Sequence, residues 1–214
     1  LETTLMGLSH DLKSPTAAIA GFASMLEDAS SAAERDMLVD QIHTSTRYLE
    51  DLVDALLEFS KVGRTQVQVE PVDLDVTLKS VARRISANAK GLTVDVSGRL
   101  PVVLANPVRM EQVFDNLIGN AVKHGGREDL TVTVSTRHTS DGVVMRVQDD
   151  GRGLGDEGER MFALFTRGGD AEAGGSGVGL GMVRRIVESY GGTVGALPSP
   201  RGAAFEVWVP AAVV

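Results

Sequence analysis

The sequence predicts an α plus α/β fold, in which a helical hairpin that pairs into a dimeric four-helix bundle precedes an α/β sandwich domain. Two long segments before residue 62 carry apolar residues at alternating spacings of three and four, which is the heptad pattern of packed helices. From about Lys61 onwards, strand segments with period two alternate with amphipathic helical segments. Two glycine-rich runs interrupt the second half of the chain.

The first two helices are predicted by their apolar seams. The seam of the first helix comprises Leu5, Leu8, Leu12, Pro15, Ile19, Phe22 and Leu26. After a turn in which Ser31 and Glu34 have capping-box spacing, the second seam comprises Leu38, Ile42, Ser45, Leu49, Leu52, Leu56 and Phe59. One hairpin with a single stripe per helix cannot bury both stripes well, so we expect a homodimer. The expected domains are residues 1–62 and 63–214.

The second half of the chain predicts a mixture of short strands and three helices. A linker and an extended strand in "VGRTQVQVEPVDL" precede a helix that begins near Asp73. A second helix has Asn106 as its N-cap, Pro107 in its first turn and Gly125 at its end. The third helix is expected in "MVRRIVESYGG". Strands are expected in "LTVDVSG", "PVVLA", "DLTVTVSTRH", "GVVMRVQDD", "TVGAL" and "AAFEVWVP".

Composition narrows the classes of function. The net charge of −8 argues against a general nucleic-acid or anionic-membrane surface, so no nucleic-acid partner is expected. The lack of cysteine excludes disulfides and thiolate metal sites and fits a reducing compartment. The sequence contains neither a signal peptide nor an apolar run of about 18 residues. Because Leu1 already lies within a helical pattern, we expect a portion of a longer protein.

The glycine-rich runs "DDGRGLG" and "GGSGVGLG" place glycine at alternate positions. Glycine lets backbone amides approach an anion closely, and a helix that follows directly adds its dipole, as in a phosphate cradle. Two flexible turns are an equally good interpretation of these runs alone. Neither run fits the GxxxxGK[ST] signature of P-loop proteins.

The helix "EQVFDNLIGNAVKHG" carries four polar residues on one face, at helical offsets of four, seven and eight: Asn116, Asn120, Lys123 and His124. Amide oxygens suit a hard cation such as Mg²⁺, and a lysine suits the phosphates that share it. The alternative is a solvated polar face.

Together the motifs resemble the catalytic core of a sensor histidine kinase of two-component signalling. "SHDLKSP" resembles the H box, "DNLIGNAVKHG" the N box, "DDGRGLG" and "GGSGVGLG" the two glycine boxes, and "MFALFTRG" the F box. The five motifs stand in family order and span nearly the whole chain. The resemblance implies a dimerisation and histidine phosphotransfer domain, followed by an ATP-binding domain shared with gyrase, ninety-kilodalton heat-shock chaperones and mismatch-repair ATPases. It implies ATP and Mg²⁺ as cofactors.

The resemblance assigns catalytic roles to four residues. In the heptad frame His10 falls on the outermost position of its helix, where it should face solvent and can attack the γ-phosphate of ATP. The Asp11 carboxylate would hold the other ring N–H, and Ser14 occupies the place of the family's water-positioning threonine or asparagine. Arg167 is the expected electrophile for the γ-phosphate.

Nucleotide contacts are assigned in the same way. Asn120 is implied as the magnesium ligand, Asn116 as its support and Lys123 as a phosphate contact, while His124 stands where the family often has tyrosine. Asp149 should accept a hydrogen bond from the adenine amino group, which favours ATP over GTP. Phe162 and Phe165 match the F box aromatics, although core packing explains them equally well. The remaining expected contacts are Gly151, Gly153, Gly175, Gly177, Val178, Gly179 and Leu180.

The expected function is autophosphorylation of His10, with transfer of the phosphate to an aspartate on the receiver domain of a response regulator, and phosphatase activity toward that regulator. The alternatives are a catalytically silent dimeric scaffold that binds nucleotide, or an ATPase or serine kinase of the same superfamily. We expect the cytoplasmic portion of a bacterial membrane-bound sensor, which meets the membrane only through a sensor region absent from this chain.

Overall fold

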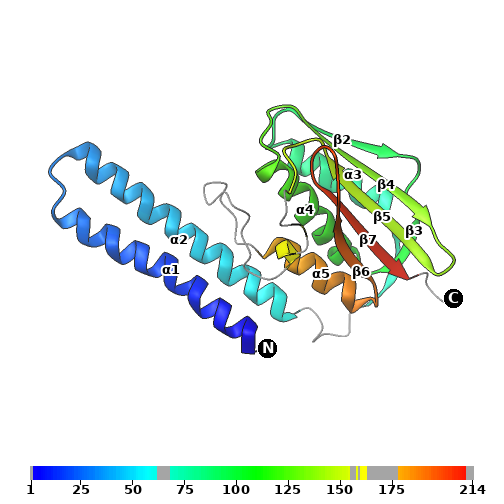
Figure 1. Ribbon diagram of the computed structural model, residues 1–214, viewed down its shortest axis with the longest axis horizontal. Helices are drawn as coiled ribbons and strands as arrows, with labels where there is room; N and C mark the ends of the chain where they lie inside the picture. The colour runs from blue at the N-terminus through cyan, green and yellow to red at the C-terminus, as the bar shows by residue number, and fades with distance from the viewer. Residues whose placement is uncertain (1, 62–67, 155–157, 159, 163–177, 211–214) are drawn as a thin grey trace.

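The computed structural model describes residues 2–61, 68–154, 158, 160–162 and 178–210. A helical hairpin lies beside an α/β domain (Figure 1), and the hairpin helix α2 contacts helix α5 of that domain. The predicted succession of a helical hairpin and an α/β domain is confirmed, and the pairing of hairpins into a four-helix bundle stays a prediction. The expected boundary between residues 62 and 63 lies outside the described residues and stays a prediction. Among the described helices, none combines the length and apolar character that a membrane span requires.

The hairpin consists of α1 (Glu2–Glu27) and α2 (Ala32–Lys61), as the seams predict. Pro15 and Leu38 are buried seam residues. The predicted cap is present, because the Glu34 N–H donates to the Ser31 hydroxyl at 3.2 Å. The return bond differs from a capping box: the Glu34 carboxylate accepts from the N–H and hydroxyl of Ser30, not from Ser31.

Two sheets form the α/β domain. Strands β1 (Glu70–Asp73) and β3 (Val102–Ala105) make a small antiparallel pair. The second sheet has the order β2-β4-β5-β7-β6, in which the pair of β2 with β4 is parallel and the other pairs are antiparallel. Its strands are β2 (Leu92–Ser97), β4 (Leu130–His138), β5 (Gly142–Asp149), β6 (Thr193–Leu197) and β7 (Ala204–Pro210).

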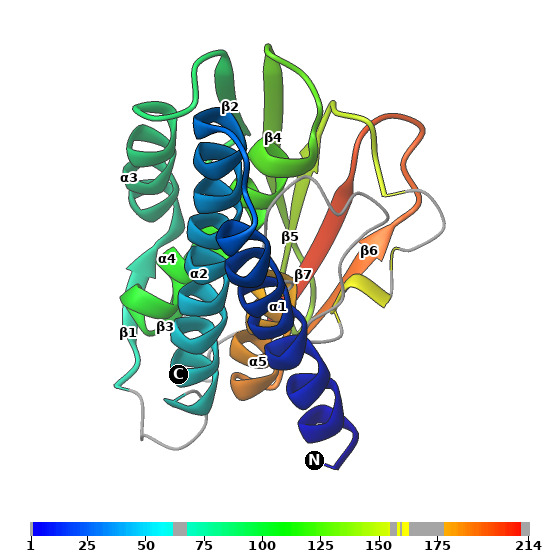
Figure 2. The same ribbon diagram turned by 90° about the vertical axis from the view of Figure 1, so that its left-hand side faces the viewer.

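Helices α3 (Leu74–Ser86), α4 (Pro107–His124) and α5 (Gly179–Ser189) cover one face of this sheet (Figure 2). The core lies between the two layers, since the inward positions of β4, β5 and β7 are apolar and buried. The predicted N-cap of α4 is confirmed, because Asn106 accepts from the Arg109 N–H at 3.2 Å. Helix α3 begins beside Asp73, as expected, and Asp73 caps it by accepting from the Asp75 N–H at 2.9 Å. The central core residues include Leu78, Val81, Phe114, Ile118, Val132, Val134, Val147, Val183, Ile186, Phe205 and Val207.

Two local features differ from the prediction. Helix α5 begins at Gly179 and not at Met182, so Gly179 and Gly181 belong to its first turn. Packing outweighs the low helix propensity of glycine there, because the flanking side chains of Val178 and Leu180 are 2% and 4% exposed. A short 3-10 helix, η2 (Arg160–Phe162), was not predicted.

Candidate functional site

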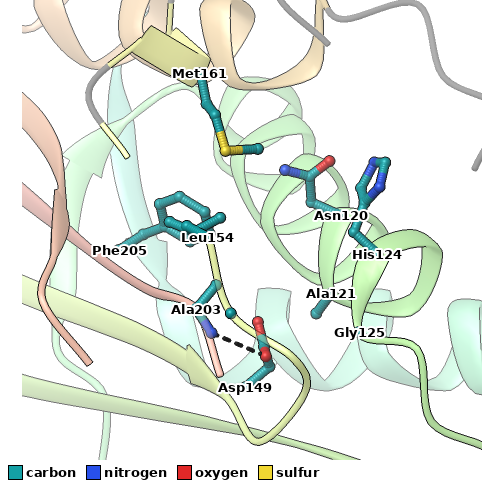
Figure 3. A pocket seen from close by; sticks show the side chains of 10 residues that line it. Asn120, Ala121, His124, Gly125, Asp149, Leu154, Met161, Ala203 and Phe205 are labelled. Carbon is teal, nitrogen blue, oxygen red and sulfur yellow. Dashed lines mark hydrogen bonds between the residues drawn. The ribbon is translucent and has the colours of Figure 1, made fainter. Parts of the chain in front are cut away.

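A pocket of about 280 Å³, including its open mouth, lies between the C-terminal half of α4, the end of β5 and the start of β7 (Figure 3). Four residues expected at the site line it: Asn120, His124, Asp149 and Gly153. Six others also line it: Ala121, Gly125, Leu154, Met161, Ala203 and Phe205. The pocket therefore combines apolar walls with one carboxylate, one amide and one imidazole.

Asp149 is the acidic group of the pocket. It ends β5 opposite Val132, on the face of the sheet that packs against the helices, and the residue is only 6% exposed. One oxygen, Oδ1, accepts hydrogen bonds from the Gly151 N–H at 2.9 Å and the Ala203 N–H at 3.0 Å. Oδ2 has no hydrogen-bond partner within the described part of the chain. The carboxylate points into the pocket (Figure 3) and offers a fixed acceptor to a ligand.

Glycines allow the loops around Asp149 to pack closely. A Cβ on Gly151 would lie 2.6 Å from the Cα of Gly125, and a Cβ on Gly202 would lie 1.9 Å from the Asp149 carbonyl oxygen. Gly153 and Gly202 also adopt left-handed φ values of 85° and 68°. Gly153 lines the pocket as expected, whereas Gly151 lies behind it and anchors Asp149.

The four polar residues of α4 separate into distinct places. Asn120 and His124, one turn apart, line the pocket, and their side chains lie side by side in Figure 3. Asn116 faces the start of α5, since its Oδ1 lies 2.7 Å from where a Cβ on Gly179 would stand, and its Nδ2 donates to the Gln112 carbonyl at 2.7 Å. Lys123 is exposed and does not line the pocket.

The expected phosphate contacts near α5 are partly described. The side chains of Val178 and Leu180 are buried in the core, so only their backbones can meet a ligand. Gly179 is the first residue of α5 and lies against Asn116. Gly175, Gly177, Phe165 and Arg167 lie outside the described residues.

The phospho-acceptor motif lies on α1. The backbone of His10 and Asp11 is helical there, and their side chains lie outside the described set. Ser14, one turn further along, is exposed. His43 and His138, which lie outside the motifs, are exposed.

The apolar walls of the pocket were not predicted as site residues. Met161, Ala203 and Phe205 have the residue types and spacing of ordinary core positions, so the sequence contains little signal of a second role. Phe162, expected in the F box or the core, is a core residue that is 2% exposed and meets the Phe205 ring edge-on at 5.8 Å. The Arg184 guanidinium lies 4.8 Å from the centre of the Phe162 ring.

The chain matches two protein families in succession. Residues 105–213 match the family described as histidine kinase-, DNA gyrase B-, and HSP90-like ATPase. Residues 1–65 match the His Kinase A (phospho-acceptor) domain. The first match covers just over half of the 214 residues.

Relatives and solved structures agree with these matches. The chain is 32% identical to the sensor histidine kinase ZraS of Klebsiella oxytoca, over 95% of this chain and 45% of ZraS. The crystal structure of full-length ShkA in complex with AMPPNP is 30% identical, with a TM-score of 0.63, over 98% of this chain and 45% of ShkA. The histidine kinase ThkA was solved in complex with the response regulator protein TrrA. The match is 19% identical and covers 98% of this chain and 61% of the ThkA chain, and its TM-score of 0.74 shows a shared fold. The chain thus spans less than half the length of ZraS and ShkA.

Proposed function

The chain belongs to the histidine kinase family, as the catalytic core of a protein-histidine kinase, and from that premise we propose that it phosphorylates His10 with ATP and passes the phosphate to an aspartate of a response regulator. The pocket would hold the nucleotide, and α1 would present the acceptor.

The pocket suits an adenine ring. Its walls include Leu154, Met161 and Phe205, which can cover a flat heterocycle, and Asp149 offers a fixed acceptor to the adenine amino group. Guanine would bring a carbonyl oxygen to the same place, so two acceptors would face each other. This contrast would give preference for ATP over GTP.

The triphosphate would lie on the side of Asn120. The Asn120 amide oxygen is a suitable ligand for Mg²⁺, which neutralises phosphate charge when bound. No cluster of three or more His, Cys, Asp or Glu in the described part of the chain could hold a metal, so the ion would be shared with the phosphates. Asn116, Lys123, His124, Arg167 and the segment from Gly175 to Leu180 are proposed as the remaining phosphate and ribose contacts.

The proposed transfer has two steps. A neutral ring nitrogen of His10 attacks the γ-phosphorus, the bond from that phosphorus to the bridging oxygen breaks, and ADP leaves. Asp11 would hold the N–H of the other ring nitrogen and so fix the tautomer. In the second step a carboxylate oxygen of the regulator attacks the phosphorus, the phosphorus–nitrogen bond breaks, and the imidazole is regenerated.

The partners follow from the same proposal. The related ThkA was solved with a response regulator, which supports a receiver domain as the partner here. Exposed Ser14, one turn after His10, would position a water for dephosphorylation of that regulator. We propose that the chain acts as a homodimer and forms the cytoplasmic portion of a membrane-bound sensor.

The observation that carries the proposal is the presence, in one chain, of a phospho-acceptor helix and of a pocket that combines apolar walls with a fixed carboxylate. We expect incubation with γ-labelled ATP and Mg²⁺ to give an acid-labile, alkali-stable label. The label should disappear in His10→Gln and remain in His43→Gln, which changes an exposed histidine on α2. Retained label in His10→Gln would overturn the assignment, and ATP binding without any label would favour a non-catalytic scaffold.

A further inference from the structure

Asp150 follows the pocket carboxylate directly in the chain and points the other way. Neighbouring residues at the end of a strand point to opposite faces, so Asp149 enters the pocket while Asp150 lies on the outer side. Asp150 does not line the pocket, and its side chain is 27% exposed. Asp150 adds a second negative charge beside the proposed nucleotide site, and its own contacts compensate for that charge.

Asp150 is attached to the start of β4. Its N–H donates to the Thr131 carbonyl at 3.1 Å, and its Oδ1 accepts from the Thr131 N–H at 2.9 Å. These reciprocal bonds hold the backbone at the corner where β5 ends. They do not require a charge, since a neutral amide oxygen would accept equally well.

The second carboxylate oxygen of Asp150 faces two positive charges. Its Oδ2 lies 3.2 Å from a guanidinium nitrogen of Arg201 and 3.9 Å from one of Arg127. The two arginines come from different loops, one before β4 and one before β7. One carboxylate thus connects three separate segments of the chain.

Each arginine is two residues away from a wall of the pocket. Arg201 precedes Ala203, which lines the pocket and donates its N–H to the Asp149 carboxylate. Arg127 follows Gly125, which also lines the pocket and accepts from the Arg152 N–H at 3.0 Å. The ion pairs of Asp150 therefore restrain two segments: the one with Ala203, which holds the Asp149 carboxylate, and the one with Gly125, which forms another wall of the pocket.

We propose that Asp150, through Arg127 and Arg201, is a positioning residue that fixes the acceptor oxygen of Asp149 and so sharpens selectivity for the adenine amino group. The inference rests on the proposed nucleotide site. The arginine side chains are 44% and 63% exposed, so each pair is weak and the expected effect is modest.

The test compares affinities for ATP and inosine triphosphate, which differ at the amino group that Asp149 would read. Both nucleotides carry the same triphosphate, so removing the negative charge of Asp150 changes both affinities equally by electrostatics alone. The ratio of the two affinities then stays unchanged. We expect Asp150→Asn, which keeps an acceptor for Thr131, to shrink the preference for ATP about two- to fivefold. Asp141→Asn is the matched control, since Asp141 precedes the opposite end of β5 and accepts from the Thr139 hydroxyl at 2.9 Å.

A second variant protects the test against a failure of Asp150→Asn to fold. Arg201→Gln leaves the bonds between Asp150 and Thr131 intact and should also shrink the preference, and the double variant should lose little more than either single one. An unchanged ratio in the folded variants would overturn the inference while leaving the nucleotide site in place. Absence of ATP binding by the unmodified chain would overturn the proposed function, and this inference with it.

Discussion

At the scale of single residues, Gly202 shows how closely the pocket is packed. It has a left-handed φ of 68°, and a Cβ there would lie 1.9 Å from the Asp149 carbonyl oxygen. Gly98 has a similar φ of 87° but nothing within 4 Å of its Cβ position. Both glycines need a positive φ, but only at Gly202 would a Cβ also meet a neighbouring atom.

We therefore predict that Gly98→Ala costs about 1 kcal/mol of unfolding free energy, the price of a left-handed alanine. Gly202→Ala should cost about 2–4 kcal/mol, because the loop must also move away from Asp149, and it should weaken ATP binding. Denaturant unfolding and nucleotide titration of both variants measure these effects. Equal losses of unfolding free energy in the two variants would mean that the loop around Gly202 moves away from Asp149 at no cost.

The sequence predicts the polar residues of the pocket better than the apolar ones. Asn120 is predicted by the polar face of its helix, and Asp149 by the resemblance of "DDGRGLG" to a glycine box. Met161 and Phe205 have the types and spacing of core residues, and only the three-dimensional arrangement of η2 and β7 beside α4 gives them a pocket face. Lys123 shares the polar stripe of α4, but the pocket covers only part of that stripe.

At the scale of elements, helix beginnings were predicted where a side chain caps them. Asp73 and Asn106 cap α3 and α4 with their own oxygens, and both helix starts were predicted. Helix α5 lacks a side-chain cap, and its start at Gly179 is decided by burial of the neighbouring residues. Local signals therefore predicted two helix starts, and tertiary packing decided the third.

A tyrosine connects the end of α5 to the start of α4. The Tyr190 hydroxyl accepts from the Asn106 N–H at 3.0 Å, and the Asn106 side chain donates to the Gln68 carbonyl at 3.2 Å, where the chain enters the α/β domain. Burial raises the pKa of Tyr190 above its usual 10.0. The folded protein thus keeps a proton that the unfolded chain loses, so stability falls as the pH rises above about 10.

We predict that Tyr190→Phe costs about 1 kcal/mol at neutral pH, because the Asn106 N–H loses its acceptor. The difference in unfolding free energy between the unmodified chain and this variant should narrow above pH 10. Tyr48→Phe removes the chain's other tyrosine and should keep the alkaline fall. Denaturant unfolding of all three proteins from pH 7 to 11 tests this prediction. A difference between the unmodified chain and Tyr190→Phe that stays constant with pH would contradict a raised pKa of Tyr190.

At the scale of the whole molecule, the hairpin leaves apolar surface uncovered. Val53 and Leu57 lie one turn apart on α2 and are 40% and 53% exposed, whereas the seam residue Leu38 is 2% exposed. Neither residue belongs to the predicted seam, because each directly follows a seam residue, Leu52 or Leu56, and so lies beside the stripe. A second copy of the hairpin would remove these side chains from water.

We accordingly predict that Leu57→Glu dissociates the proposed dimer, because a carboxylate would then have to be buried without a partner. Sedimentation equilibrium should show the mass falling from twice 22.6 kDa to that of one chain. Val76→Glu makes the same change at a 65% exposed position of α3 and should leave the mass unchanged. Nucleotide affinity should persist in the Leu57→Glu monomer, since the described residues that line the pocket all belong to the α/β domain. A Leu57→Glu protein that stays dimeric would place the contact between the chains away from this face of α2.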